Sequence, residues 1–186
     1  ARPETLAPLQ MAASTLADLR RWQRGDVELH QRLQMALQWQ SHEGCQLLFL
    51  DDAEYQPLLA AISDPPPALF VRGNASALHD PQIAMVGTRH PSPLGAETAR
   101  RFARSFTASG LTVTSGMAMG VDGACHQGAL DAAGQKVAVW GTGLDNCYPR
   151  RHRKLAEAIV DSGGALVSEL WPDAGQHPAQ FPRRNR

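Results

Sequence analysis

The chain has 186 residues, no net formal charge, and 43% hydrophobic and 19% charged positions. These figures suit one full domain with a sizeable core, or a domain plus a small appendage. They exclude an acidic disordered chain and a strongly basic protein that coats nucleic acid over its whole surface. The charge is unevenly divided, because residues 1–80 hold six basic and ten acidic side chains, whereas residues 81–186 hold twelve and eight. Most of the basic residues are arginine, which suits bidentate contacts with phosphate.

The cysteines and histidines offer no pattern of a disulfide framework or a metal site. Cys45, Cys125 and Cys147 are widely spaced and form no C-x-x-C pair. The histidines do not have the spacing of metal ligands. No apolar run reaches the length that crosses a membrane, and no signal-peptide pattern opens the sequence. We therefore expect reduced thiols in a cytoplasmic protein that uses neither metal nor cofactor and does not enter a membrane.

Residues 1–43 are rich in Gln, Leu and Arg and have helical periodicity. Leu16, Leu19 and Trp22 share one helical face, and leucines recur every fourth residue after Gly25. The repeat lasts too few heptads for a coiled coil. The pattern predicts a helical segment over residues 1–43, the tail of an N-terminal helical domain, followed by a second domain over residues 44–186.

Short strands and helices are predicted from residue 44 on, and their alternation becomes regular from Ile83. Strands are predicted at 46–50, 68–71, 83–86, 111–114, 136–140 and 165–168, and helices at 54–62, 92–109, 121–133 and 151–162. Three successive strand–helix units imply right-handed crossovers. We expect an α/β fold with an open, mostly parallel sheet and helices on both faces. No closing element is predicted in the basic segment that follows, so we expect a domain truncated at its C-terminus.

Three glycine-bearing loops follow three of the predicted strands, at residues 87–89, 115–123 and 141–145. In an open parallel sheet, ligands bind beyond the carboxyl ends of the strands. Glycine lets backbone N–H groups approach a ligand, and helix N-termini attract anions. One such loop could simply permit a tight turn, but three neighbouring loops favour a phosphate site.

Neither common nucleotide fingerprint is present. The G-x-G-x-x-G pattern fails at both candidate glycine loops, and no G-x-x-x-x-G-K-[ST] segment occurs. The sequence therefore argues against NAD and ATP as ligands. Cations are present instead. Arg89 lies in the first loop, where it could grip a phosphate. Arg150 and Arg151 follow Pro149, expected at the start of a helix, where cations are unfavourable unless an anion offsets them. Phe181 before the terminal arginines suits single-stranded nucleic acid.

Support for catalysis is poor. Asp122 and His126 lie one helical turn apart and could form a hydrogen bond, but an N-terminal cap and a packed or loop-supporting histidine explain them more simply. Glu169 could act as an acid or base, although one carboxylate is thin support. No G-x-S-x-G nucleophile elbow is present. We predict no catalytic residue.

Several motifs, taken in order, resemble one family. Residues 83–89 (IAMVGTR) resemble its VGSR segment, residues 115–130 its SGlArGiD..AH.gAL segment, and residues 141–149 its GtGlD..YP segment. Ser168-Glu169 and residues 181–186 (FPRRNR) resemble its SE and FP.RNR motifs. The match runs from about Gly44 to Arg186. On these residues the chain resembles the DprA/Smf family, DNA-processing protein A.

The resemblance implies an extended Rossmann-like fold that binds single-stranded DNA and lacks catalytic activity. It also implies that the DNA is delivered to the recombinase RecA during natural transformation, and that the full-length protein is a homodimer. By motif position, the expected DNA-binding residues are those of the glycine loops, the arginines beside them and the terminal segment. They are Gly87, Thr88, Arg89, Ser115, Gly116, Met117, Gly120, Asp122, His126, Gly141, Gly143, Asp145, Arg150, Arg151, Phe181, Arg183, Asn185 and Arg186.

The chain departs from the family pattern at a few positions. Met119 stands where the family usually has Arg, which removes one cation from the expected site, and Thr88, Leu94 and Cys125 replace Ser, Tyr and Ala. Two alternatives stay open. One is a Rossmann-like nucleotide phosphoribohydrolase using Glu169 or Asp122, although its P-G-G-x-G-T-x-x-E motif is missing. The other is a mononucleotide-binding module.

Overall fold

The computed structural model describes residues 13–185, with side chains described from residue 17 on. The chain divides into two compact units after Ser41. The first unit contains helices α1 (Ala13–Gln23) and α2 (Val27–Gln40). Asp26 begins α2, because its carboxylate accepts the N–H of Leu29 at 3.0 Å and so satisfies a donor of the first turn. Residues 1–12 of the predicted helical segment lie outside the described part of the chain, as does Arg186 of the predicted site.

The second unit is built on a six-stranded sheet in the order β1-β2-β6-β5-β4-β3. The strands are β1 (Cys45–Phe49), β2 (Ala68–Gly73), β3 (Gln82–Ala84), β4 (Thr112–Gly116), β5 (Lys136–Val139) and β6 (Ala165–Ser168). Strands β3 to β6 are parallel, and β1 and β2 are antiparallel at the other edge. The predicted open, mostly parallel sheet is therefore confirmed.

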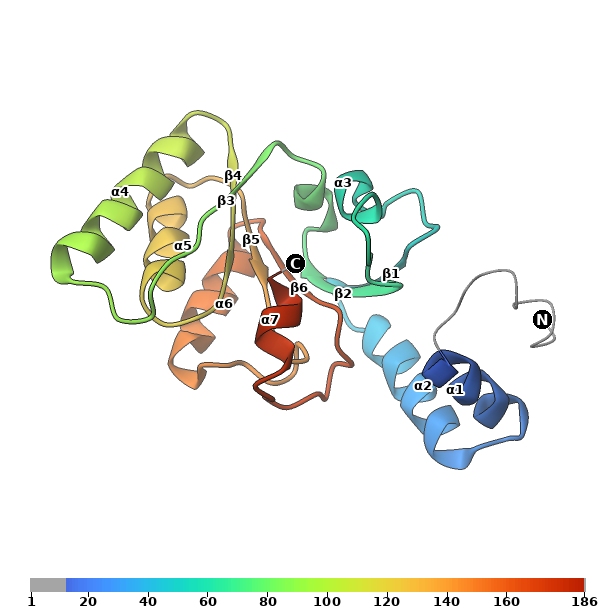
Figure 1. Cartoon of the computed structure of the whole chain (residues 1–186). Helices are drawn as coiled ribbons and strands as arrows, with labels where there is room; N and C mark the ends of the chain where they lie inside the picture. The colour runs from blue at the N-terminus through green and yellow to red at the C-terminus, as the bar shows by residue number, and fades with distance from the viewer. Residues whose placement is uncertain (1–12, 186) are drawn as a thin grey trace. The chain divides into compact units, whose positions relative to one another are not determined.

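The three long helices lie on one face of this sheet (Figure 1). They are α4 (Pro93–Ala108), α5 (Val121–Asp131) and α6 (Arg153–Asp161), and they pack side by side. Strands β3 to β6 follow one another in space as they do in sequence, so successive right-handed crossovers place their helices on the same side. Small residues allow α4 and α5 to approach closely: Ala99 and Ala103 pack with Ala129 over Val113.

The second face of the sheet carries only short helices. These are α3 (Pro57–Ala60), the 3₁₀ turn η2 (Ala75–Leu78) and α7 (Gln180–Arg184). Here Val71, Val137 and Val167 form a second core with Leu78 and Tyr55. Helices thus occupy both faces as expected, but the long ones share one face.

Two predicted helix boundaries differ from the structure, and one helix was not predicted. The helix expected at 54–62 shortens to α3, because Gln56 caps it directly before Pro57 and the helix ends at Ala60. The helix expected at 151–162 is a 3₁₀ turn over Arg150–His152, capped by Pro149, followed by α6. The expectation that no element follows β6 is wrong, since Gln180–Arg184 forms α7. This last difference matters most, because α7 reaches the carboxyl ends of β4 and β5.

Candidate functional site

A small cavity of about 50 Å³ opens where the loops after β3, β4 and β5 meet α7. We call it the arginine pocket, because two arginines from different elements line it. Its lining residues are Arg89, Met117, Ala118, Met119, Gly141, Tyr148, Pro149, Phe181 and Arg184. The pocket lies at the carboxyl edge of the parallel strands, the position where open α/β sheets bind ligands.

The first two loops are locked together. The carbonyl of Thr88 accepts the N–H of Val121 at 3.1 Å. Gly120 adopts a φ of 86°, and a Cβ there would overlap the carbonyl oxygens of Thr88 and Arg89. Glycine is therefore required at position 120 on both conformational and steric grounds. This contact fixes the backbone of exposed Arg89 relative to the start of α5.

The second loop is held from beneath by polar side chains, of which His126 and Ser115 are buried and His152 is partly buried. His126 lies 2.8 Å from the carbonyl of Gly116 through Nε2, and His152 lies 2.9 Å from that of Met117 through Nδ1. Since a carbonyl only accepts, both histidine nitrogens donate. The hydroxyl of Ser115 donates to the carbonyl of Met85 at 2.6 Å. These bonds set the shape of the loop that faces the arginine pocket.

Four of the side chains expected to bind DNA are consequently buried. They belong to Ser115, Met117, Asp122 and His126. These side chains support the loop from inside the protein, although Met117 also lines the arginine pocket. Contact of these four residues with DNA stays a prediction. Burial lowers the pKa of His126 to about 4, so the ring is neutral at physiological pH.

Gly116 makes room for a partly buried guanidinium group. A Cβ at this position would overlap Nη1 of Arg184 and Oδ2 of Asp122. Arg184 donates from Nη1 to the carbonyl of Val139 at 2.8 Å, which ties α7 to the end of β5. Burial raises the pKa of Asp122, opposed by the Ala118 N–H and by the positive charge of Arg184. Arg184 was absent from the residues predicted from the sequence, which included its neighbours Arg183 and Asn185.

Arg89 and Phe181 meet across the pocket. The guanidinium carbon Cζ of Arg89 lies 5.6 Å from the centre of the Phe181 ring, within the range of a cation–π contact. Phe181 rests on Gly141, where a Cβ would lie 2.7 Å from Cδ1 of the ring. Tyr148 lies next to Phe181, with ring centres 5.7 Å apart and planes at 46°. Tyr148 was also absent from the residues predicted from the sequence, although it belongs to the family's Tyr-Pro motif.

The third glycine loop contributes less to the pocket than its sequence predicts. The N–H of Gly143 donates to the carbonyl of Ala174 at 2.8 Å, and the N–H of Asp145 donates to that of Pro172 at 3.0 Å. These donors are therefore occupied by the segment after β6. Of residues 141–145, only Gly141 lines the arginine pocket, and DNA contacts of Gly143 and Asp145 stay a prediction. The loop after β5 still lines the pocket through Gly141, Tyr148 and Pro149, so all three loops and α7 surround the site.

Among the described residues, the other arginines predicted to bind DNA do not line the arginine pocket. Arg150 is exposed, and Arg151 lines a groove between α5 and α6 together with Met119 and Lys154. Arg183 forms an ion pair with Glu169, with Nε and Oε2 3.2 Å apart. Asn185 accepts a hydrogen bond from Nε of Arg184 at 2.7 Å through its side-chain oxygen.

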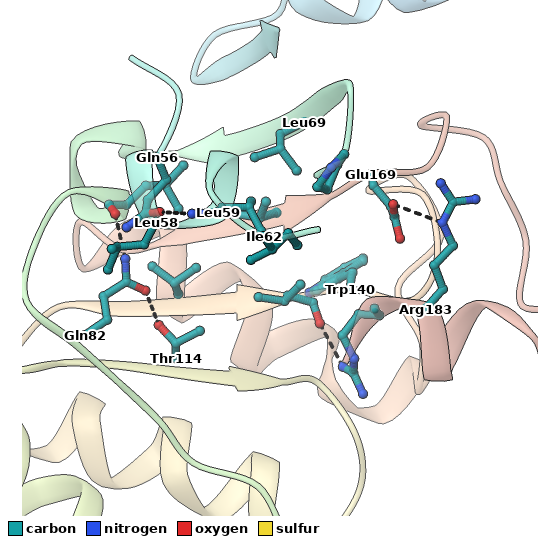
Figure 2. Close-up of a pocket in the computed structure, with 16 residues that line it drawn as sticks. Gln56, Leu58, Leu59, Ile62, Leu69, Gln82, Thr114, Trp140, Glu169 and Arg183 are labelled. Carbon is teal, nitrogen blue, oxygen red and sulfur yellow. Dashed lines mark hydrogen bonds and ion pairs between the residues drawn. The ribbon is translucent and has the colours of Figure 1, made fainter. Parts of the chain in front are cut away.

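Figure 2 shows a second cavity, on the sheet face that carries α3 and η2. It measures about 360 Å³ and is lined mainly by aliphatic side chains, including Leu59, Ile62 and Leu69. Glu169 and Arg183 lie at one end of it, joined by their ion pair. Asp122 does not line this cavity, so the two carboxylates considered for catalysis do not face a common space.

Two other features are absent from the described residues, 13–185. No group of three or more His, Cys, Asp or Glu side chains is placed there to hold a metal ion. No described helix is both long and apolar enough to cross a membrane.

A sequence model of the family described as DNA recombination-mediator protein A matches residues 46–186. The chain belongs to this family. Protein Smf of Escherichia coli (strain K12) is 42% identical over 154 residues, covering 83% of this chain and 41% of that protein. The DNA processing protein DprA of Streptococcus pneumoniae is 38% identical over 139 residues, covering 74% of this chain and 48% of that protein. The chain thus spans less than half the length of these two relatives.

Solved structures agree with this assignment. The X-ray structure of DNA processing protein A from Streptococcus pneumoniae matches with a TM-score of 0.80 and 29% identity, over 100% of this chain and 62% of that one. A structure of DNA processing protein A from Helicobacter pylori matches with a TM-score of 0.66 and 27% identity, over 78% of this chain and 64% of that one. This second structure concerns the single-stranded DNA binding mode of the Helicobacter protein.

Proposed function

We propose that this chain binds single-stranded DNA at the arginine pocket, with one phosphate held between Arg89 and Arg184. The observation that carries the proposal is the convergence of these two guanidinium groups from separate elements on one cavity. A phosphate is the ligand that such a pair of planar donors fits best.

The charge balance of the pocket supports an anionic ligand. Asp122 is the carboxylate beside Arg184, and burial shifts its pKa toward the neutral form. Burial lowers the pKa of Arg184, and the positive charge of Arg89 adds a smaller lowering, so the two arginines repel each other. A bound phosphate would relieve this repulsion.

The aromatic rings favour a nucleic-acid strand over a free phosphate. Phe181 and Tyr148 line the same pocket as the arginines. Proteins that bind single strands combine a cationic groove with aromatic rings on which bases stack. The Helicobacter pylori relative, described in terms of its single-stranded DNA binding, supports the same ligand for this family member.

At the level of the whole protein, we propose delivery of the strand to the recombinase RecA in natural transformation. The family name, recombination mediator, supports this role. We also propose that the full-length protein is a cytoplasmic homodimer and that it acts without catalysis or a cofactor. These proposals rest on family membership, since the chain covers 41% and 48% of the two relatives described.

Binding of a labelled oligothymidylate, measured by fluorescence anisotropy at several salt concentrations, tests the pocket. We expect Arg89→Ala to bind roughly tenfold more weakly, because a charge-assisted contact is lost. The slope of log K against log salt should become shallower by about 0.7, the value for one phosphate contact in a single strand.

Arg72→Ala is the matched control for this experiment. Arg72 is exposed and lies in β2 opposite Leu166, near the amino end of β6 and so at the opposite edge of the sheet from the pocket. Arg72→Ala removes the same charge as Arg89→Ala and should change the affinity for the oligothymidylate less than twofold. Equal affinity of Arg89→Ala and the wild type would overturn the proposal. Binding of thymidine monophosphate as tightly as the oligonucleotide would instead support a mononucleotide module.

A further inference from the structure

The two aromatic rings of the arginine pocket differ in how available they are to a ligand. Arg89 covers the ring of Phe181, and Gly141 lies against its Cδ1 and Cε1 atoms. A base can therefore stack fully on Phe181 only after Arg89 has moved. Tyr148, in contrast, is 43% exposed.

The ring of Tyr148 is partly exposed and is not stacked on Phe181. Its plane is tilted by 46° to that of Phe181, so the two rings touch without stacking on each other. Among the residues that the structure describes, no hydrogen bond to its hydroxyl is found. A tyrosine kept at a surface without such a bond contributes mainly its ring, which is the part that stacks on a base.

Position adds a second argument. Tyr148 lines the same cavity as Arg89 and Arg184, and Phe181 contacts both the tyrosine ring and Arg89. A nucleotide whose phosphate is held by the arginines has its sugar and base within reach of the next ring. Tyr148 is that ring.

We propose that Tyr148 is the base-stacking residue of this site, holding the base of a nucleotide next to the phosphate bound by Arg89. The inference rests on the proposed function, single-stranded DNA binding at the arginine pocket. Phe181 becomes a second platform when Arg89 turns from its ring to the phosphate. Stacking on Tyr148 is independent of base identity, because every base offers a flat π face.

The test compares Tyr148→Leu and Tyr148→Phe in binding an oligothymidylate and an abasic oligomer of the same length. Loss of a stacking ring costs roughly tenfold in affinity, so Tyr148→Leu should bind the oligothymidylate about tenfold more weakly. Tyr148→Phe keeps the ring and should stay within twofold of the wild type. On the abasic oligomer, Tyr148→Leu should equal the wild type, a result that a merely structural role would not give.

Phe102→Leu is the matched control, because it also removes an exposed aromatic ring but lies on α4 and does not line the pocket. Its affinity should not change. Wild-type affinity of Tyr148→Leu, or an equal loss on both oligomers, would overturn the inference. If Arg89→Ala weakens binding while Tyr148→Leu does not, the inference fails and the proposed function stands. If neither variant weakens binding, the proposed function itself fails.

Discussion

Three glycines of the site each leave space for one particular group. Gly120 admits the carbonyls of the first loop, Gly116 admits the guanidinium of Arg184, and Gly141 admits the ring of Phe181. The sequence pattern indicates one general purpose for these glycines, backbone approach to a phosphate. The structure shows that they are also required for the protein to bring its own loops and α7 together.

A single buried histidine couples the site to pH. His126 is fully buried and donates to the carbonyl of Gly116, and among the described residues its Nδ1 has no hydrogen-bond partner. Its pKa is about 4 in the folded chain, against about 6.5 when unfolded. Between these values the unfolded chain binds a proton that the folded chain does not. Stability is therefore unaffected by this group above pH 6.5 and is lost as the pH falls toward 4.

We expect this group to remove roughly 3 kcal/mol of unfolding free energy between pH 6.5 and pH 4. Urea unfolding at a series of pH values measures the change. His126→Gln, which cannot titrate, is the comparison that isolates the histidine from the carboxylates that titrate below pH 5. The variant should be less stable at pH 7 but show a flatter pH dependence over this interval. Parallel curves for the two proteins would contradict the assignment.

At the scale of elements, α7 completes the site. This helix of five residues makes two polar contacts with the sheet and the residue after β6, from Arg184 to the carbonyl of Val139 and from Arg183 to Glu169. It presents Phe181 to Arg89. A helix this short has little stability of its own, so its position depends on these tertiary contacts. The pocket is consequently sensitive to any change at the surface on which α7 rests.

Gly141→Ala tests this dependence. The added methyl group would lie 2.7 Å from Phe181, so the ring and α7 must shift. We expect affinity for the oligothymidylate to fall roughly three- to tenfold, with about 1 kcal/mol of stability lost to overpacking. Anisotropy and thermal unfolding measure the two effects separately.

Gly175→Ala is the control for this substitution, because a Cβ at position 175 meets no atom within 4 Å. It should leave both affinity and melting temperature unchanged. Wild-type affinity in Gly141→Ala would show that the position of Phe181 does not matter for binding.

At the scale of the whole molecule, basic and acidic residues are unevenly distributed along the chain. The zero net charge conceals an excess of basic groups in residues 81–186, where the three loops and α7 of the pocket lie. A neutral protein can therefore still offer a local cationic site. Both hydrophobic cores of the sheet lie within residues 42–186.

We accordingly predict that residues 42–186 fold and bind without residues 1–41. The removed segment holds five arginines and four carboxylates, so its loss barely changes the charge. Circular dichroism melting should show a cooperative transition close to that of the 186-residue chain, and affinity for the oligothymidylate should stay within twofold. An unfolded product, or a loss of binding in a folded one, would show that the first unit is needed.

The periodicity of the sequence determined the sheet and its long helices. Hydrophobic strands and amphipathic helices are local patterns, and the right-handed crossover rule turns three such units into a parallel sheet. Arg89 was identified in the same way, because a loop after a parallel strand always reaches the binding edge.

The tertiary structure alone decided which neighbours of these loops face the pocket. Sequence spacing could not place Arg184 rather than Arg183 in the pocket, because the choice depends on how α7 docks on Gly116 and β5. It could not show that the donors of Gly143 and Asp145 are taken by residues 172–174, or that His126 is buried beneath Gly116. These outcomes depend on contacts between segments far apart in the chain. Local sequence sets the elements, and packing between them selects the side chains of the site.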